Sequence, residues 1–264
     1  MSATATQKTK VVSREEWVEA RKELLVKEKA LTRKRDALAA ERQRLPWVKV
    51  EKNYVFDTAN GRKTLADLFD GRSQLMVYHF MLGPGWEAGC PGCSSIGDHI
   101  GGSVTHLANR DVTLLAVSRA PLAEIETFKK RMGWNFRWVS SAGTEFNKDY
   151  GVFFAKEELS DGEMLYNFEK QKAKGEEMPG ASAFYKNEKG EVFRTYSTYG
   201  RGLEQLMIVY SYLDMVPKGR DEDPTAQHKG SWMRHHDKYE SDYYGGAGPQ
   251  TKGGEHSCCG EAKK

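Results

Sequence analysis

The sequence QLMVYHFMLGPGWEAGCPGC at residues 74–93 decides the fold. Its first nine residues form a continuous apolar run with the length and residue types of a buried strand. The Gly-Pro-Gly turn at residues 83–85 ends that strand, and residues 93–109 can form a helix. The stretch therefore predicts a strand, a turn and a helix, with two cysteines three residues apart at the start of the helix.

Further strands and helices flank this unit. Strands are predicted at residues 48–50, 54–56, 112–118, 136–140, 181–185 and 191–196, and helices at 65–69, 122–132 and 203–215. The alternating order after residue 74 implies parallel pairing, whereas the short turn at residues 187–190 implies an antiparallel hairpin. We therefore predict an α/β fold with a central mixed sheet.

The composition excludes several classes of protein. The 264 residues are 39% hydrophobic and 11% aromatic, so the chain is not wholly disordered, and a net charge of +3 is too small to indicate nucleic acid. No run approaches the roughly 18 apolar residues of a membrane span, and the N-terminal MSATATQKTK lacks the apolar stretch of a secretory signal. We expect a cytoplasmic protein with no membrane or nucleic-acid partner and no cofactor.

Polar residues gather towards both ends of the chain. We expect one folded domain at residues 47–216, preceded by a disordered N-terminus at residues 1–12 and a long amphipathic helix at residues 13–46. Residues 217–244, with several aromatic side chains, are expected to dock on the domain. Residues 245–264 are expected to form a disordered tail that contains two cysteines.

The helix predicted at residues 13–45 begins with a capping-box pattern, Ser13 and Glu16. Apolar residues recur every seven positions along it, at Trp17, Leu24, Leu31, Leu38 and Leu45. Two interpretations remain open: a helix that lies on its own domain, or a seam that forms a homodimer. Acidic residues interleaved with the basic ones argue against a nucleic-acid role.

The motif Cys90-Pro91-Gly92-Cys93 carries the chemistry. A helix N-terminus stabilises a thiolate, so Cys90 is expected to be an exposed nucleophile and Cys93, one turn further in, the resolving thiol. Pro91 limits the freedom of the loop, and Gly92 allows the tight turn. Two alternatives stay open: a structural zinc site, although the folded part has no second cysteine pair, and two inert buried thiols.

These residues also carry a resemblance. Tyr78-His79-Phe80-Met81, Gly85-Trp86 and the dithiol motif resemble the thioredoxin-like family catalogued as domain of unknown function 899. Further matching runs lie at residues 114–122, 130–141, 193–202 and 219–223, and at Trp232 with residues 235–237. The resemblance covers roughly residues 11–244, and it implies a thioredoxin-like three-layer fold with peroxiredoxin-like insertions for residues 47–216.

The chain departs from better-known relatives at three positions. Thioredoxins have Gly-Pro between the cysteines where this chain has Pro-Gly, and peroxiredoxins have a Thr where this chain has Glu87. Thioredoxin folds also keep a cis-proline beside the dithiol. Pro179 is the candidate for that place, although Gly180 separates it from the next predicted strand, and an ordinary loop proline is the alternative.

Three more residues are candidates for the lining of the site. His79, inside the first strand, is either a core residue or a proton shuttle for Cys90. Trp86, on the loop before the dithiol, covers the site or packs beside it. Arg119, at the end of the strand at residues 112–118, lies at the edge where α/β folds bind ligands. It is expected to lower a thiolate pKa, to bind an anionic substrate or to form a surface ion pair.

The tail adds His256, Cys258 and Cys259 as candidate ligands for a soft metal. Exchange of the tail thiols with Cys90 and Cys93 and an unselected chain end are the alternatives.

Together the residues predict a thiol–disulfide oxidoreductase that acts on a thiol, a disulfide or a peroxide and is regenerated by a reducing partner. A non-catalytic redox-sensing or soft-metal-binding module is the first alternative, and a structural zinc protein the second.

Overall fold

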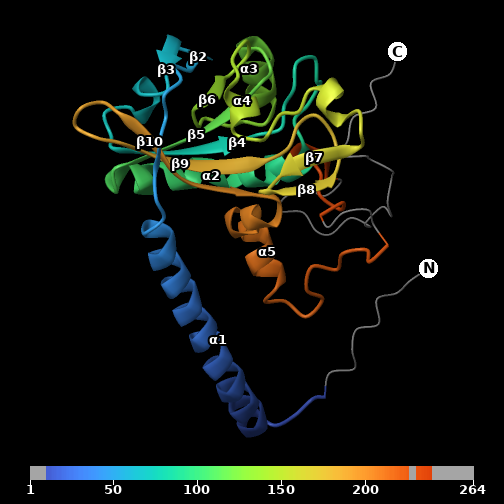
Figure 1. Ribbon diagram of the computed structural model, residues 1–264. Helices are drawn as coiled ribbons and strands as arrows, with labels where there is room; N and C mark the ends of the chain where they lie inside the picture. The colour runs from blue at the N-terminus through green and yellow to red at the C-terminus, as the bar shows by residue number, and fades with distance from the viewer. Residues whose placement is uncertain (1–9, 226–229, 240–264) are drawn as a thin grey trace.

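The computed structural model describes residues 10–225 and 230–239. Within them an eight-stranded sheet has the order β1-β10-β9-β4-β5-β6-β2-β3 (Figure 1). Its strands are β1 (Val48–Lys49), β2 (Val55–Thr58), β3 (Gly61–Thr64), β4 (Gln74–His79), β5 (Val112–Ser118), β6 (Trp138–Ser140), β9 (Gly180–Lys186) and β10 (Val192–Tyr199). A separate two-stranded sheet pairs β7 (Glu163–Tyr166) with β8 (Glu169–Lys172).

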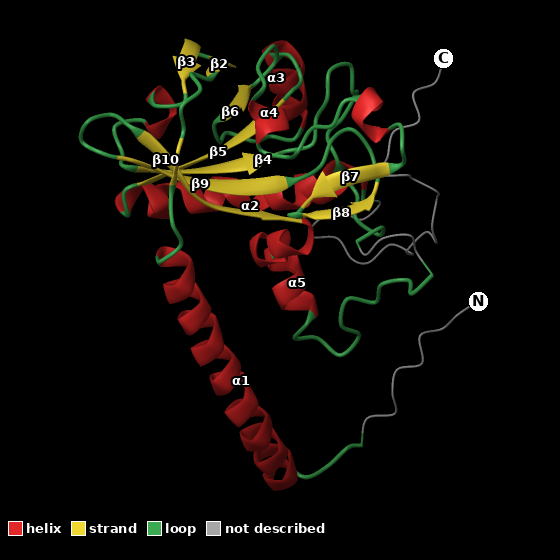
Figure 2. Cartoon of the chain, in the orientation of Figure 1, coloured by secondary structure: helices red, strands yellow, loops and turns green. Residues whose placement is uncertain are grey.

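Helices lie on both faces of the large sheet (Figure 2). The α-helices are α1 (Arg14–Gln43), α2 (Pro91–Asn109), α3 (Leu122–Arg131), α4 (Phe146–Asp149) and α5 (Ile208–Leu213). Short 3-10 helices are η1 (Asp67–Phe69), η2 (Lys156–Leu159), η3 (Gly200–Leu206) and η4 (His236–Lys238).

The centre of the sheet has the strand pairing of a thioredoxin-like fold. β4 pairs in parallel with β5 and antiparallel with β9, β5 pairs in parallel with β6, and β9 and β10 form an antiparallel hairpin. α2 lies in the connection between β4 and its parallel neighbour β5. The predicted α/β fold, with a mixed central sheet and a long N-terminal helix, is confirmed.

The side chains of β4 alternate between two hydrophobic clusters. Tyr78 belongs to the cluster that α2 and α3 cover, whereas Leu75 and Val77 belong to the cluster on the opposite face. Because successive strand residues point to opposite faces, this one strand joins both halves of the core. Each such buried side chain contributes about 1.5–3 kcal/mol to stability. The result is three layers: α2 and α3 on one face, the sheet in the middle, and η1 with α4 on the other face.

The glycines within α2 allow a close contact with the chain after α3. A Cβ on Gly97 would lie 2.9 Å from the Trp134 ring, so only glycine lets the two approach this closely. These glycines weaken the helix as an isolated segment, yet α2 runs unbroken from Pro91 to Asn109. Packing against the sheet therefore outweighs low helix propensity here.

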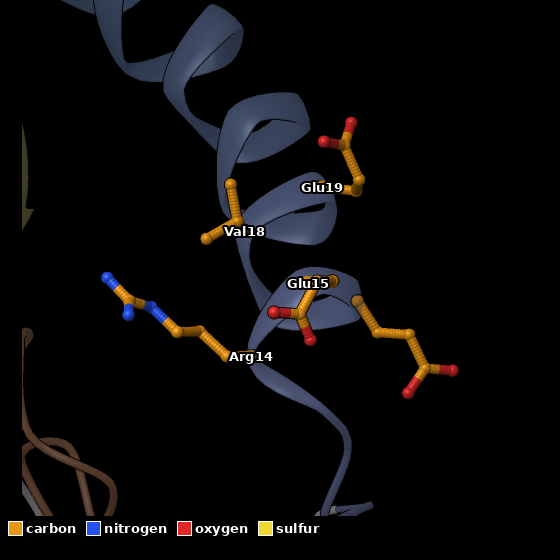
Figure 3. A pocket seen from close by; sticks show the side chains of 5 residues that line it. Arg14, Glu15, Val18 and Glu19 are labelled. Carbon is orange, nitrogen blue, oxygen red and sulfur yellow. The ribbon is translucent and has the colours of Figure 1, made fainter.

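The helix α1 projects away from the domain (Figure 1), and none of its residues is buried. The predicted capping box forms, since the Glu16 amide donates to Ser13 Oγ at 3.2 Å and the Ser13 amide to Glu16 Oε2 at 3.0 Å. Figure 3 shows side chains spreading around its first turns, beside a hollow lined by Arg14, Glu15, Glu16, Val18 and Glu19. The interpretation of a helix lying on its own domain is therefore wrong, and the homodimer seam stays a prediction.

Two local predictions also need correction. The closing helix expected at residues 203–215 is divided into η3 and α5, because Met207 has φ −98° and ψ 77°, outside the helical region. The β7–β8 hairpin was not predicted. Its turn residues Asn167 and Phe168 both have positive φ, and phenylalanine gives no sequence signal for such a turn.

Among the described residues, no helix combines the length and apolar character needed to cross a bilayer.

Candidate dithiol site

Cys90 and Cys93 lie on the first turn of α2 at different depths. Cys90 is the N-cap residue, and its carbonyl accepts a hydrogen bond from the Ser94 amide at 2.9 Å. Its side chain is half-buried, whereas Cys93 is only 2% exposed. An N-cap side chain faces the amides of the first helical turn, which carry partial positive charge. The thiol nearest the surface therefore occupies the position that favours a thiolate.

Pro91 is the first residue of α2, where its missing N–H costs no helical hydrogen bond. Two residues three apart at a helix start have Cβ atoms roughly 5–6 Å apart, so a small adjustment allows a disulfide. The structure holds Cys90 and Cys93 without a disulfide between them. The motif thus has the geometry of a dithiol that can open and close.

The backbone in front of Cys90 is tightly fixed. A Cβ on Gly89 would lie 2.4 Å from Phe80 Cε1 and 3.0 Å from Phe128 Cε1. The Cys90 amide donates to the Met81 carbonyl at 3.1 Å, which ties the dithiol to the chain just after β4. Only glycine fits at position 89, and the start of α2 is therefore held against the aromatic core.

Two buried tyrosines surround the deeper sulfur. Tyr78, 2% exposed, hydrogen-bonds to Cys93, and burial together with this contact raises its pKa well above the usual value. Burial likewise raises the pKa of Tyr166, and the nearby Cys93 raises it further. Both phenols stay protonated at neutral pH, so Tyr78 can donate to a Cys93 thiolate. Sequence reasoning missed both, although the alternation of β4 places Tyr78, not its neighbour, on the side of α2.

His79 is not brought to the dithiol. Its ring stacks on Tyr150, at 5.7 Å between centroids, and Nε2 lies 2.9 Å from Ser182 Oγ. Both partners belong to the opposite side of β4 from Cys93. Burial and the charge of Arg194 lower the pKa of His79 to about 3, so the imidazole is neutral at physiological pH. His79 is therefore a core residue with no path to Cys90.

Trp86, Arg119 and Glu177 gather at the carboxyl ends of β4 and β5. Arg119 Nε and Glu177 Oε1 are 2.7 Å apart, and the Arg119 guanidinium lies 3.2 Å from the centre of the Phe153 ring. Trp86 packs on the same cluster as Cys90, and its Nε1 and Glu177 Oε1 both lie against Gly83. Arg119 thus forms a partly buried ion pair instead of facing the dithiol directly.

Pro179 precedes β9, whose first residue, Gly180, pairs with His79. No cis peptide bond occurs among the described residues, so the bond before Pro179 is trans, in contrast to the cis-proline considered from the resemblance. Its carbonyl accepts a hydrogen bond from the Tyr166 hydroxyl at 2.6 Å. Pro179 is therefore linked to the site through Tyr166, which lies near Cys93.

A groove of about 910 Å³ runs along α2. Its walls come from the end of α1 and the chain after it, from β4, β5, β9 and β10, and from η3 and α5, and they are mostly apolar. Tyr78 lines this groove and also hydrogen-bonds to Cys93. The groove therefore extends to the residue that contacts the buried sulfur.

The described residues supply no group of three or more His, Cys, Asp or Glu side chains that could hold a metal ion. They thus give the structural zinc alternative no ligand set. His256, Cys258 and Cys259, the tail residues considered for a soft metal, lie outside the described residues.

Comparison with solved structures finds similar chains at low sequence identity. Similar solved structures include a PrxQ mutant of Xylella fastidiosa, 15% identical, covering 62% of this chain and 94% of that chain with TM-score 0.40. Peroxiredoxin Q of Xanthomonas campestris is 14% identical, covering 67% and 99%, with TM-score 0.44. Peroxidoxin BcpB of Mycobacterium tuberculosis is 11% identical, covering 62% and 94%, with TM-score 0.42.

No curated protein matches the sequence. The family described as "Bacterial protein of unknown function (DUF899)" matches residues 6–239, which is most of the chain. The chain belongs to this family.

Proposed function

We propose that the chain is a thiol–disulfide oxidoreductase in which Cys90 is the nucleophile and Cys93 the resolving thiol. The observation that carries the proposal is the placement of the two sulfurs on one helical turn. Cys90 is the half-buried N-cap residue of α2, and Cys93 lies behind it, buried and hydrogen-bonded to Tyr78. Inert structural thiols need neither the N-cap position nor a phenol partner.

The reaction proceeds in two exchange steps. The Cys90 thiolate attacks one sulfur of a substrate disulfide, forms a mixed disulfide and releases the other substrate sulfur as a thiolate. The Cys93 thiolate then attacks Cys90 Sγ, forms the Cys90–Cys93 disulfide and releases the second substrate sulfur. The substrate gains two electrons and, at neutral pH, two protons. A reducing dithiol of a second molecule then attacks the Cys90–Cys93 disulfide to form a mixed disulfide, and its second thiolate closes the reductant's own disulfide and releases the protein dithiol.

Tyr78 acts on the second step. Its phenol stays protonated and donates to Cys93, so it stabilises the thiolate that must attack Cys90. It also fixes the direction of a sulfur that no solvent reaches, because Cys93 is 2% exposed. Tyr78 is therefore a catalytic residue of this proposal, since it touches a reacting atom.

The same thiols allow a peroxide as the oxidant. The Cys90 thiolate would attack one peroxide oxygen and become a sulfenic acid, while the other oxygen leaves as water or an alcohol. Cys93 would then displace the sulfenic hydroxyl as water and form the same disulfide. The disulfide and peroxide reactions share every protein residue named above and differ only in the molecule that is reduced.

Two single variants and one double variant of the full chain test the proposal. The wild type is expected to reduce insulin disulfides with a dithiol reductant, and Cys90→Ser to lose this activity. Cys93→Ser is expected to accumulate a mixed disulfide at Cys90, because the resolving step is missing. The double variant Cys258→Ser/Cys259→Ser is the matched control and is expected to keep the activity.

Other outcomes assign the alternatives. Peroxide consumption that depends on Cys90 without insulin reduction would assign the peroxide reaction. Reversible formation of the Cys90–Cys93 disulfide without turnover of either substrate would favour the redox-sensing module. Full activity of Cys90→Ser would refute the nucleophile and with it the proposed function.

A further inference from the structure

Residues 230–239, which we call the C-terminal strap, contact α2, which carries the dithiol, and the end of α3. Three polar contacts hold the strap in place. His235 Nε2 lies 2.7 Å from the Gly89 carbonyl, His236 Nδ1 lies 2.6 Å from Asp98 Oδ1 on α2, and Arg131 Nε at the end of α3 lies 2.8 Å from Asp237 Oδ2. The first of these contacts reaches the residue that directly precedes Cys90.

The surroundings of His235 fix its protonation and tautomer. A carbonyl accepts hydrogen bonds, so Nε2 carries the proton that is donated to Gly89. The other ring nitrogen, Nδ1, lies 3.4 Å from Arg131 Nη2, which can only donate, so Nδ1 carries no proton. Neutral His235 therefore satisfies both neighbours at once, and a doubly protonated ring would turn an N–H towards a guanidinium.

Charged and aromatic groups face His235 from every element packed on it. Arg131 lies on α3, Asp98 on α2 and Asp237 on the strap itself, and the Phe128 ring packs edge-on at 5.5 Å between centroids. Burial lowers the pKa of His235 and Arg131 lowers it further, whereas the Gly89 contact and the two aspartates raise it. The pKa of His235 lies below its usual value, so the neutral form predominates at neutral pH.

His235 completes the restraint on the chain before Cys90. Phe80 and Phe128 fill the space that a Cβ on Gly89 would occupy, and the Cys90 amide donates to the Met81 carbonyl. The contact from His235 fixes the remaining direction, that of the Gly89 carbonyl. The orientation of the Gly89–Cys90 peptide sets where the Cys90 side chain lies relative to the amides of α2.

We propose that His235 is a positioning residue for the dithiol: through Gly89 the neutral imidazole of the C-terminal strap holds Cys90 over the first turn of α2. The inference rests on the proposed function for its meaning but concerns the reactivity of one thiol, which is measurable without turnover. Protonation of His235 adds an N–H at Nδ1, towards Arg131, and keeps the Nε2–H that donates to Gly89, so the contact with Gly89 does not depend on deprotonation of the ring.

The test measures alkylation of Cys90 by iodoacetamide in the full chain. Cys93, Cys258 and Cys259 are replaced by Ser so that only Cys90 reacts. His235→Phe keeps the ring but loses the donor, and His235→Gln keeps a donor that does not titrate. His236→Phe is the matched control, because it removes the neighbouring contact to Asp98 and leaves Gly89 untouched. Circular dichroism confirms that each variant is folded.

Several results support the proposal together. His235→Phe is expected to slow alkylation at neutral pH by about 3- to 10-fold, whereas His235→Gln and His236→Phe stay near the parent rate. A parent rate in His235→Phe or an equal loss in His236→Phe would each overturn it.

The same series separates this inference from the proposed function. A wild type that fails to reduce insulin, but whose Cys90 alkylation depends on His235 as described, would refute the function and leave the positioning role intact. If the wild type and His235→Phe reduce insulin equally well, and Cys90 is alkylated at equal rates in both, the function stays intact and the positioning role is refuted.

Discussion

The hydrogen bond from Tyr78 to the buried Cys93 is the contact whose removal tests the chemistry of the site most directly. Tyr78→Phe removes one oxygen and leaves the ring, which packs between Phe80 and α2. No large cavity forms, because the hydroxyl is directed at the sulfur and not at the hydrophobic cluster. The change therefore affects the protonation of Cys93 with little effect on packing.

The magnitude follows from the charge of the acceptor. A hydrogen bond to a charged group contributes about 1.5–3 kcal/mol, and it is stronger for the Cys93 thiolate than for the thiol. Since 1.36 kcal/mol corresponds to one pKa unit, loss of the bond is expected to raise the pKa of Cys93 by roughly 1 to 2. Cys93 is 2% exposed, so water cannot replace the missing donor.

The assay is thiolate absorbance against pH in a chain whose other three cysteines are Ser. Tyr54→Phe is the matched control, because its hydroxyl also donates to a charged acceptor, Asp149 Oδ2 at 2.6 Å, but on the opposite face of the sheet. Only Tyr78→Phe is expected to raise the pKa of Cys93. A pKa that changes equally in both variants would refute the role of Tyr78 in stabilising the thiolate.

Three further predictions concern packing, assembly and pH. Gly89→Ala is expected to lower the free energy of unfolding by about 1–3 kcal/mol in a denaturant titration, because its Cβ would overlap Phe80, whereas Gly102→Ala, with open space around it, is expected to raise it by about 0.5–1 kcal/mol. In sedimentation, the full chain is expected to be a dimer and a chain lacking residues 1–46 a monomer, because Leu24, Leu31 and Leu38 are 47–51% exposed along one face of α1; a monomeric full chain would end the seam hypothesis. Burial raises the pKa of Glu177 above 4.5 despite Arg119, so folded protein binds this proton more tightly than unfolded protein. Glu177 therefore makes stability fall as the pH rises above about 4.5, and thermal melts of Glu177→Gln are expected to lack this part of the pH dependence.

The fold was predictable where local pattern and tertiary packing agree. The apolar runs at residues 74–82 and 112–118 are long enough to be strands only if both faces are buried, and β4 and β5 are indeed covered on both sides. The closing helix failed because Met207 adopts an extended backbone that its residue type does not signal. Phe168 in a positive-φ turn hid the β7–β8 hairpin for the same reason.

The two thiols of the site were predictable, but their surroundings were less so. The motif and the preceding strand place Cys90 and Cys93 at a helix start, and the structure shows one sulfur near the surface and the other buried. His79 was predicted as a lining residue because its side chain titrates near neutral pH, and the direction in which each side chain of the strand points was not considered. Adjacent strand residues face opposite sides, so only one of them could reach α2.

The contacts that set the chemistry of the dithiol come from segments far from it in sequence. His235 reaches Gly89 across 146 positions, and Tyr166 reaches the neighbourhood of Cys93 from a hairpin that no local pattern indicated. Neither contact could be predicted from the sequence pattern, because a single contact between distant segments produces no repeat of residue types. The dithiol motif therefore specifies which two sulfurs are candidates for the chemistry, whereas the β7–β8 hairpin and the C-terminal strap supply neighbours of those sulfurs that the motif does not indicate. Variants confined to residues 90–93 would test which sulfur reacts, but they would not test what the distant neighbours of the two sulfurs contribute.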